Sequence, residues 1–414
     1  MSAAAPRRGY VLGVLMLVYG CNFLDRQILV ILQEPIKADM GLSDAQLGLL
    51  TGFAFAVFYV IAGIPIAYLA DRGNRRNIIA LAVTFWSAMT MLCGAAQNYL
   101  QLVLLRIGVG IGEAGSIPPS HSMISDLFAP GERARAFALF TIGLYFGVAA
   151  GYVFGGQFGE YIGWRHALLI AGIPGILLAL LLRFTVAEPL RTPSATAPPG
   201  FGQAVAALTG QPMFWLVTLA TAAGTFVIYG TGSFNPSYLM RSHGLPLGTT
   251  GIVLAVTSSV SGIIGTWLGG VLADRLGRRD PAWYLRICLV GQALSVPFSV
   301  IAYLSPGLHA AVAALFVAHV LVVFMLAPSV AVIQGMVVPE MRALASSVFF
   351  FVVNLIGLGL GPLAVGLVSD ALTPQYGSQG LRYAQVSAAG VGLVAAVLFG
   401  AAIVRSRQEK AQLH

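Results

Sequence analysis

Long apolar runs, separated by short polar breaks, follow one another along the whole chain. Each run is about 20 residues or longer, which is the length of helix that crosses a bilayer. The runs cover about residues 10–32, 46–70, 77–97, 99–124, 135–159, 165–184, 212–239, 248–272, 282–304, 308–335, 342–369 and 384–404. The pattern predicts an all-α membrane protein with twelve transmembrane helices.

The composition supports this interpretation and excludes a soluble protein. Of the 414 residues, 57% are hydrophobic and only 9% are charged, and the mean hydropathy is +0.84. A soluble domain carries about 25% charged residues. We therefore expect the lipid bilayer to be the main partner. The net charge of +8 is attributed to loops on the inner side of the membrane, and no nucleic-acid partner is expected.

Basic residues are distributed unequally between the two sides of the predicted membrane. Seventeen of the 23 lysines and arginines lie on the side that carries the N-terminus, and four lie on the other. Those four are Lys37, Arg165, Arg241 and Arg382. Because basic loops stay on the cytoplasmic side, we expect both termini in the cytoplasm and the protein in the inner membrane of the cell. We also expect the protein to be a monomer.

One longer polar break divides the chain near its middle. It is rich in proline and poor in apolar residues between Ala187 and Gly210, which is typical of a connector between two folded parts. The prediction is a six-helix half over residues 1–185, a cytoplasmic linker over 186–210 and a second six-helix half over 211–414.

The two halves carry the same motifs and are interpreted as diverged copies of one unit. The sequence DRGNRR at residues 71–76 returns as DRLGRR at 274–279, which is 203 residues later. Such repeats are typical of secondary transporters, in which the halves move about a central site. The candidate gating residues are Asp71, Arg72, Arg75, Arg76, Asp274, Arg275, Arg278 and Arg279. The candidate hinge or packing residues are Gly147, Gly151, Gly361 and Pro362.

Several of these stretches resemble a known family. The DRLGRR loop is similar to the loop motif of the major facilitator superfamily, although the first copy has Asn74 where glycine is expected. The glycines from Gly147 to Gly156 resemble the antiporter motif of that superfamily, with Tyr152 in place of proline. Residues 22–26 (NFLDR) and 106–128 resemble the spinster-type lipid transporters. The resemblance implies the major facilitator fold, with two pseudo-symmetric six-helix halves.

Four ionisable residues lie well inside predicted spans, and all four belong to the first half: Asp25, Arg26, Arg106 and Glu113. A charge at the bilayer centre costs about 3 kcal/mol, so such groups normally face a cavity or a partner. Arg106 and Glu113 are two helical turns apart and share one helix face. We expect Asp25 and Glu113 to carry a coupling proton while competing for the two arginines. A permanently paired structural network is the alternative.

The two arginines stay charged and suit an anionic substrate. The spinster resemblance implies that Arg26 and Arg106 recognise a charged headgroup, so the expected substrate is a small amphiphilic anion such as a lysolipid or sphingoid phosphate. Further residues could line the site or simply pack: Asn22, Tyr229, His319 and Asn354.

Other functions are weighed against this one. A proton-coupled transporter of small water-soluble organic acids or drugs would carry the same charges and stays open. An intramembrane enzyme is disfavoured, since the sequence has no His-Glu-Xaa-Xaa-His and no Gly-Xaa-Ser-Xaa-Gly. We therefore expect no catalytic residues, no metal site and no cofactor, with the proton as the coupling ion.

Overall fold

The computed structural model describes residues 8–191, 208–338 and 341–412. These residues form helices and no strands. Ten helical runs among them are long and apolar enough to cross a membrane. Two of the ten, Pro130–Thr185 with 56 residues and Leu344–Gln408 with 65, are long enough to cross twice.

Each of these two runs is interrupted by a glycine in a backbone conformation that other residues rarely adopt. Gly163 has φ 82° and ψ 158°, and Gly377 has φ 55° and ψ −136°. The prediction of an all-α membrane fold with twelve spans is therefore confirmed.

From residue 8 up to the predicted linker, the described residues form eight helices and a short π-helical turn. They are α1 (Arg8–Ile31), α2 (Gln33–Met40), α3 (Asp44–Gly48), η1 (Leu49–Phe53), α4 (Ala54–Arg72), α5 (Arg75–Cys93), α6 (Tyr99–Glu113), α7 (Ile117–Leu127) and α8 (Pro130–Thr185). Residues 192–207, which make up most of the predicted linker, lie outside the described part of the chain.

The chain after the linker repeats this pattern of long helices with short irregular turns. Its elements are α10 (Pro212–His243), α11 (Leu247–Gly277), α12 (Trp283–Leu304), α13 (Leu308–Val322), η2 (Val323–Met325), α14 (Leu326–Gly335), α15 (Arg342–Val353), η4 (Asn354–Leu360), α16 (Gly361–Tyr376), η5 (Gly377–Gln379) and α17 (Gly380–Gln412).

Asparagine side chains in the polar breaks begin two of the helices. The Asn74 side chain accepts a hydrogen bond from the backbone N–H of Asn77 at 2.9 Å, and Asn98 does the same for Gln101 at 3.0 Å. Asparagine is a preferred N-cap residue because its oxygen satisfies a free backbone N–H. Asn74, the residue at which the first repeated loop departs from the family motif, is therefore the N-cap of α5.

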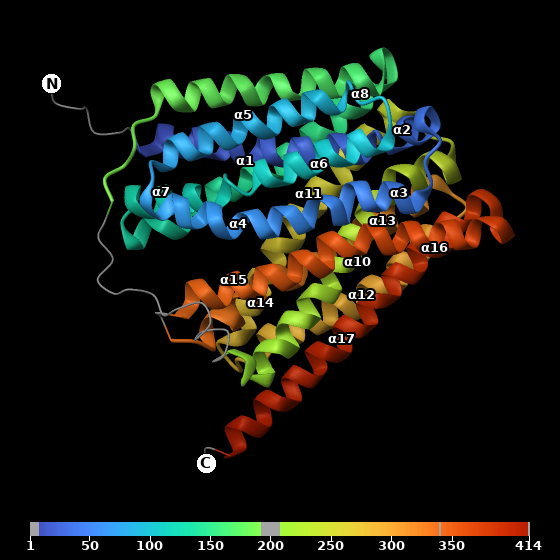
Figure 1. Cartoon of the computed structure of the whole chain (residues 1–414). Helices are drawn as coiled ribbons and strands as arrows, with labels where there is room; N and C mark the ends of the chain where they lie inside the picture. The colour runs from blue at the N-terminus through green and yellow to red at the C-terminus, as the bar shows by residue number, and fades with distance from the viewer. Residues whose placement is uncertain (1–7, 192–207, 339–340, 413–414) are drawn as a thin grey trace. The chain divides into compact units, whose positions relative to one another are not determined.

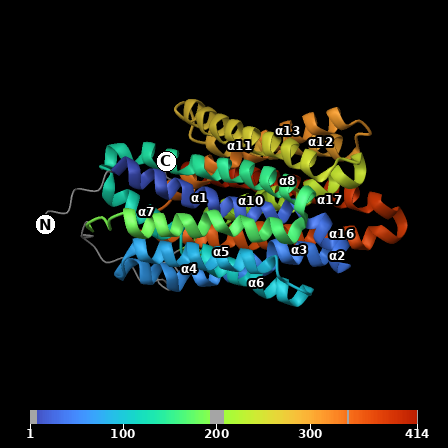
Figure 2. The ribbon, with the colours of Figure 1, turned by 90° about the horizontal axis from the view of Figure 1, so that it is seen from above.

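The helices form two compact units. The first consists of Met1–Ser43, Ala54–Pro193 and Gly244–Ser259, and the second of Asp44–Phe53, Ser194–His243 and Val260–His414. In the first unit α8 packs against both α1 and α5 (Figure 1). In the second, α17 packs against α10 and α12, and α12 runs beside α13 (Figure 2). The second predicted span is therefore divided: its beginning, up to Phe53, belongs to the second unit, and the rest, from Ala54, belongs to the first.

Glycines bring the backbones of α1 and α8 into direct contact in the first unit. A Cβ atom on Gly147 would lie 2.0 Å from the carbonyl oxygen of Gly20, and one on Gly151 would lie 2.7 Å from that of Leu24. Small residues of this kind allow membrane helices to pack closely. The spacing of these glycines along α8 therefore follows its contact with α1.

We expect Gly147→Ala to lower the melting temperature of the detergent-solubilised protein by several degrees. The added methyl group would meet backbone, which cannot rotate away, and overpacking of this kind costs about 1–3 kcal/mol. The control is Gly13→Ala on α1, where an added Cβ meets nothing within 4 Å. Equal melting temperatures for the two variants would contradict this account of the α1–α8 contact.

A second close approach occurs in the second unit, at the start of α16. A Cβ atom on Gly361 would lie 2.8 Å from the carbonyl oxygen of Phe226, and one on Gly48 would lie 2.2 Å from that of Pro362. The π-helical segment η4 directly precedes Gly361. Such segments widen a helix locally and often occur at functional sites.

Candidate functional site

The four predicted in-span ionisable residues all lie in the first unit, on α1 and α6. The Nε atom of Arg26 donates a hydrogen bond to Oε2 of Glu113 at 2.7 Å. Asp25 and Glu113 are fully buried, and Arg106 is 3% exposed. Arg106 lies close enough to both carboxylates to interact with their charges. Two cations and two carboxylates are therefore held together inside a helical bundle.

Aromatic rings surround the Arg26 guanidinium group. Its Cζ atom is 4.6 Å from the ring centre of Phe55, 5.0 Å from that of Tyr59 and 5.2 Å from that of Phe23. The guanidinium group of Arg106 also lies over Phe55, at 5.4 Å. A desolvated cation over an aromatic face gains about 2 kcal/mol. The sequence did not reveal this arrangement, because no helical spacing connects α4 with α1 and α6.

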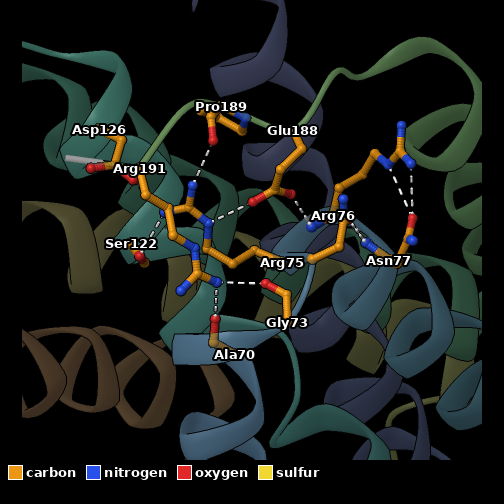
Figure 3. Close-up of polar contacts among 11 residues, drawn as sticks. Ala70, Gly73, Arg75, Arg76, Asn77, Ser122, Asp126, Glu188, Pro189 and Arg191 are labelled. Atoms are coloured by element: carbon orange, nitrogen blue, oxygen red, sulfur yellow. Dashed lines mark hydrogen bonds and ion pairs between the residues drawn. The ribbon is translucent and has the colours of Figure 1, made fainter. Parts of the chain in front are cut away.

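The first repeated loop is held by a buried arginine. Arg75 is 1% exposed, and its guanidinium group donates to Oε1 of Glu188 at 2.7 Å, to the Ser122 hydroxyl at 2.8 Å and to the Pro189 carbonyl at 2.9 Å (Figure 3). It also forms an ion pair with Asp126 on α7. Arg75 therefore joins α5 to α7 and to the segment that follows α8.

Arg76 and Arg191 make further hydrogen bonds at the same place. We call the contacts that Arg75, Arg76 and Arg191 make here the Arg75 clamp. The backbone N–H of Arg76 donates to Oε2 of Glu188 at 2.8 Å. Arg191 donates to the carbonyl oxygens of Ala70 at 2.6 Å and Gly73 at 2.5 Å, at the end of α4 (Figure 3). Of the other candidate gating residues here, Arg72 is exposed, and its guanidinium group lies 3.8 Å from the ring centre of Tyr68. The side chain of Asp71 lies outside the described residues.

The second copy of the loop is arranged differently. Asp274 is exposed and accepts a hydrogen bond from the Tyr284 hydroxyl at 2.7 Å. The other three candidate residues of this loop, Arg275, Arg278 and Arg279, are also exposed. The repeated sequence therefore produces a buried clamp in one copy and a solvated loop in the other.

The remaining candidates of the second half lie in the second unit. The His319 ring nitrogen Nδ1 is 3.0 Å from the Ser261 hydroxyl oxygen. Tyr229 and Asn354 are half-buried, and Asn354 begins the π-helical segment η4. Asn22, in contrast, belongs to the first unit and is fully buried on α1 beside Asp25. The function of these residues stays a prediction.

A buried charged cluster in the second unit was not predicted from the sequence. Asp44 is 1% exposed and accepts two hydrogen bonds from Arg241, at 2.7 and 2.8 Å, and one from the Ser369 hydroxyl at 2.6 Å. The Asp370 carboxylate accepts from the backbone N–H groups of Asp44 and Ala45 at 2.9 and 2.8 Å. Bidentate pairs of this kind are strong. These residues come from three distant stretches of chain, so no local motif marks them.

Comparison with known proteins identifies the family. The sequence profile of the Major Facilitator Superfamily matches residues 15–362. An MFS-type efflux pump of Mycolicibacterium smegmatis is 37% identical, over 98% of this chain and 95% of the relative. The sphingosine-1-phosphate transporter of Danio rerio is 27% identical, over 88% and 76% of the two chains.

A solved structure is similar over nearly its whole length. It is the crystal structure of a bacterial homologue of the human lysosomal transporter spinster, in an inward-facing and unoccupied conformation. It superimposes with a TM-score of 0.88 at 34% identity, covering 97% of this chain and 98% of that one. The chain belongs to the major facilitator superfamily and, within it, to the spinster-type transporters. It is an integral membrane transporter and not an enzyme.

Proposed function

We propose that the protein moves an amphiphilic organic anion, of the lysolipid or sphingoid phosphate class, through the inner membrane by alternating access coupled to protons. The observation that carries this proposal is the pair between Arg26 and the fully buried Glu113, at 2.7 Å. A relative that transports sphingosine-1-phosphate supports the substrate class. The excess of basic residues on one side supports cytoplasmic termini.

The proposed coupling is an exchange of partners at Arg26. When Glu113 is ionised, it occupies Arg26 and excludes an anionic headgroup. When Glu113 takes up a proton, its negative charge disappears, and Arg26 becomes available to a phosphate or carboxylate of the substrate. Arginine keeps its own charge throughout. Proton and anion therefore bind together, and neither the empty nor the loaded site leaves an isolated charge in the bundle.

The aromatic rings give this exchange a fixed geometry. The guanidinium group lies over the rings of Phe23, Phe55 and Tyr59, so its position does not depend on Glu113 alone. The same rings offer apolar surface to the part of an amphiphile next to its headgroup. The Arg75 clamp is proposed to hold the ends of α4, α5 and α7 together in one of the two access states.

The test uses purified protein in liposomes that contain a pH-sensitive dye. Adding a lysolipid with a phosphate headgroup is expected to change the internal pH, and the rate is expected to rise with acyl length up to a plateau. Short carboxylates and sugars serve as controls and are expected to give no signal. A response to short carboxylates that ignores acyl length would instead establish a transporter of water-soluble acids. Lysolipid uptake without any pH change would refute the coupling.

A further inference from the structure

Asp25 on α1 and two side chains of α5 carry buried polar atoms that form no hydrogen bond within the described part of the chain. Both carboxylate oxygens of Asp25, the indole Nε1 of Trp86 and the hydroxyl of Thr90 have no hydrogen-bond partner among the described residues. Asp25 and Trp86 are fully buried, and Thr90 is 1% exposed. Buried polar atoms are normally paired, so a group of unpaired ones indicates a functional arrangement or bound water.

The two α5 side chains in this group lie near the Asp25 carboxylate. Trp86 and Thr90 are one helical turn apart, so they share a face of α5, and both lie within interaction range of Asp25 without reaching hydrogen-bond geometry. The helices α5 and α1 meet at this level, because a Cβ atom on Gly175 of α8 would lie 3.0 Å from Cβ of Ser87 and 3.3 Å from Sγ of Cys21. Both Trp86 and Thr90 can donate a hydrogen bond, the tryptophan through N–H and the threonine through O–H. They are therefore the groups that can stabilise a negative charge on Asp25 from the side of α5.

Other charged or titratable groups also act on Asp25. These are Glu113 and Arg106 on α6. The thiols of Cys93 on α5 and Cys21 on α1 also lie within range of the Asp25 charge. Glu113 is already paired with Arg26. Arg106 interacts with the charges of both carboxylates, so it does not serve Asp25 alone, and Trp86 and Thr90 are the donors that α5 adds at Asp25.

We propose that Trp86 and Thr90 are positioning residues that set the pH at which Asp25 binds the coupling proton. They donate to its carboxylate directly or through one buried water. This inference rests on the proposed function, because it takes Asp25 to bind a coupling proton in addition to Glu113.

The two donors have different consequences because their chemistry differs. The indole N–H can only donate, so it favours the ionised carboxylate, which can only accept. The threonine hydroxyl can donate to the ionised form or accept from the protonated form, so it serves both. Trp86 therefore acts on the proton affinity of Asp25, whereas Thr90 acts mainly on the position of its carboxyl group.

The experiment measures Asp25 itself by infrared difference titration of the protein in lipid nanodiscs. The carboxylic acid band that disappears in Asp25→Asn is assigned to Asp25. In Trp86→Phe we expect the midpoint of this band to rise by about one pH unit, a tenfold gain in proton affinity, because a hydrogen bond to a charged group is lost. In Thr90→Val we expect less than half that shift. An unchanged midpoint in Trp86→Phe would refute the proposal.

Two controls separate a specific effect from a general one. Thr84→Val removes a hydroxyl group from the same helix. This hydroxyl donates to the Ala80 carbonyl at 2.8 Å, so its loss is expected to leave the midpoint of the Asp25 band unchanged. Replacing Trp86 by benzothienylalanine, which keeps the shape of the side chain and lacks only the N–H, is expected to reproduce the Phe variant. If Trp86→Phe does not fold, the benzothienylalanine variant supplies the test in its place.

The pH profile of transport separates this inference from the function on which it rests. Trp86→Phe is expected to shift the pH profile of transport by about one pH unit. The same substitution is expected to cause no shift in a protein that already carries Asp25→Asn. A further shift in that background would refute the role of Trp86. If the wild-type protein carries no proton with its substrate while the Asp25 band still shifts in Trp86→Phe, the proposed coupling fails and the effect of Trp86 on the proton affinity of Asp25 stands.

Discussion

Glu113→Gln is expected to abolish proton-coupled accumulation of substrate while the protein still folds. Glutamine keeps the size of the side chain and can still accept from Arg26, but it cannot exchange a proton. Glu113→Ala would instead leave Arg26 buried without its partner, which costs about 3–5 kcal/mol and would lower stability as well. Glutamine is therefore the informative substitution.

The measurement is substrate uptake into liposomes driven by a pH jump, recorded over a range of pH. The matched control is Glu132→Gln, because Glu132 also pairs with an arginine, Arg8, at 2.7 Å but both side chains are about half exposed. Exposed pairs contribute about 0–1 kcal/mol, so this variant is expected to behave as wild type. Uptake by Glu113→Gln with an unaltered pH dependence would remove Glu113 as the proton carrier.

Arg75→Leu is expected to destabilise the first unit by about 3–5 kcal/mol and to stop transport. The reason is that the carboxylates of Asp126 and Glu188, together with the Pro189 carbonyl, lose their shared partner, and removing one member of a buried pair leaves uncompensated charge. The loop between α4 and α5 would then separate from α7. Thermal unfolding and hydrogen exchange of residues 70–77 measure the two effects.

The repeat supplies the control for this substitution. Arg278 occupies the position equivalent to Arg75 in the second loop, but it is exposed. Arg278→Leu is expected to change the melting temperature by less than one third of the Arg75→Leu effect, since surface substitutions are usually within about 0.5 kcal/mol. Equal losses in the two variants would show that burial of Arg75 does not explain its role.

Much of the fold could be predicted from the sequence because a bilayer restricts a chain so strongly. Every spanning segment must satisfy its backbone internally, so long apolar runs can only be helices there. The breaks between the spans could be predicted too, because Gly163 and Gly377, which interrupt the two longest helical runs, both lie between predicted spans. The π-helical segments η1 and η4 lie inside predicted spans, and no local pattern of the sequence indicated them.

The candidate site could be predicted only in part, for a related reason. Charges inside apolar runs are rare enough to stand out, which is how Asp25, Arg26, Arg106 and Glu113 were selected. Their partners are ordinary residues of a membrane helix. Phe55, Trp86 and Thr90 look in the sequence like any other lipid-facing or packing residues, and only their position in the bundle gives them a role.

The repeated loops show the same limit. Their sequences are nearly the same, yet Arg75 is buried in a clamp whereas Arg278 is exposed. The carboxylates that make the difference, Asp126 and Glu188, are 51 and 113 residues away along the chain.

The amino-acid sequence alone determined the class of protein, the number of spans, the repeat and the four charges inside the spans. These properties follow from local composition, because the cost of placing polar groups in hydrocarbon acts on each segment separately. The tertiary structure alone decided which charge pairs with which, which aromatic rings surround Arg26 and which copy of the loop becomes a clamp. Those choices depend on contacts between helices far apart in the chain, where the strength of an interaction is set by burial and distance.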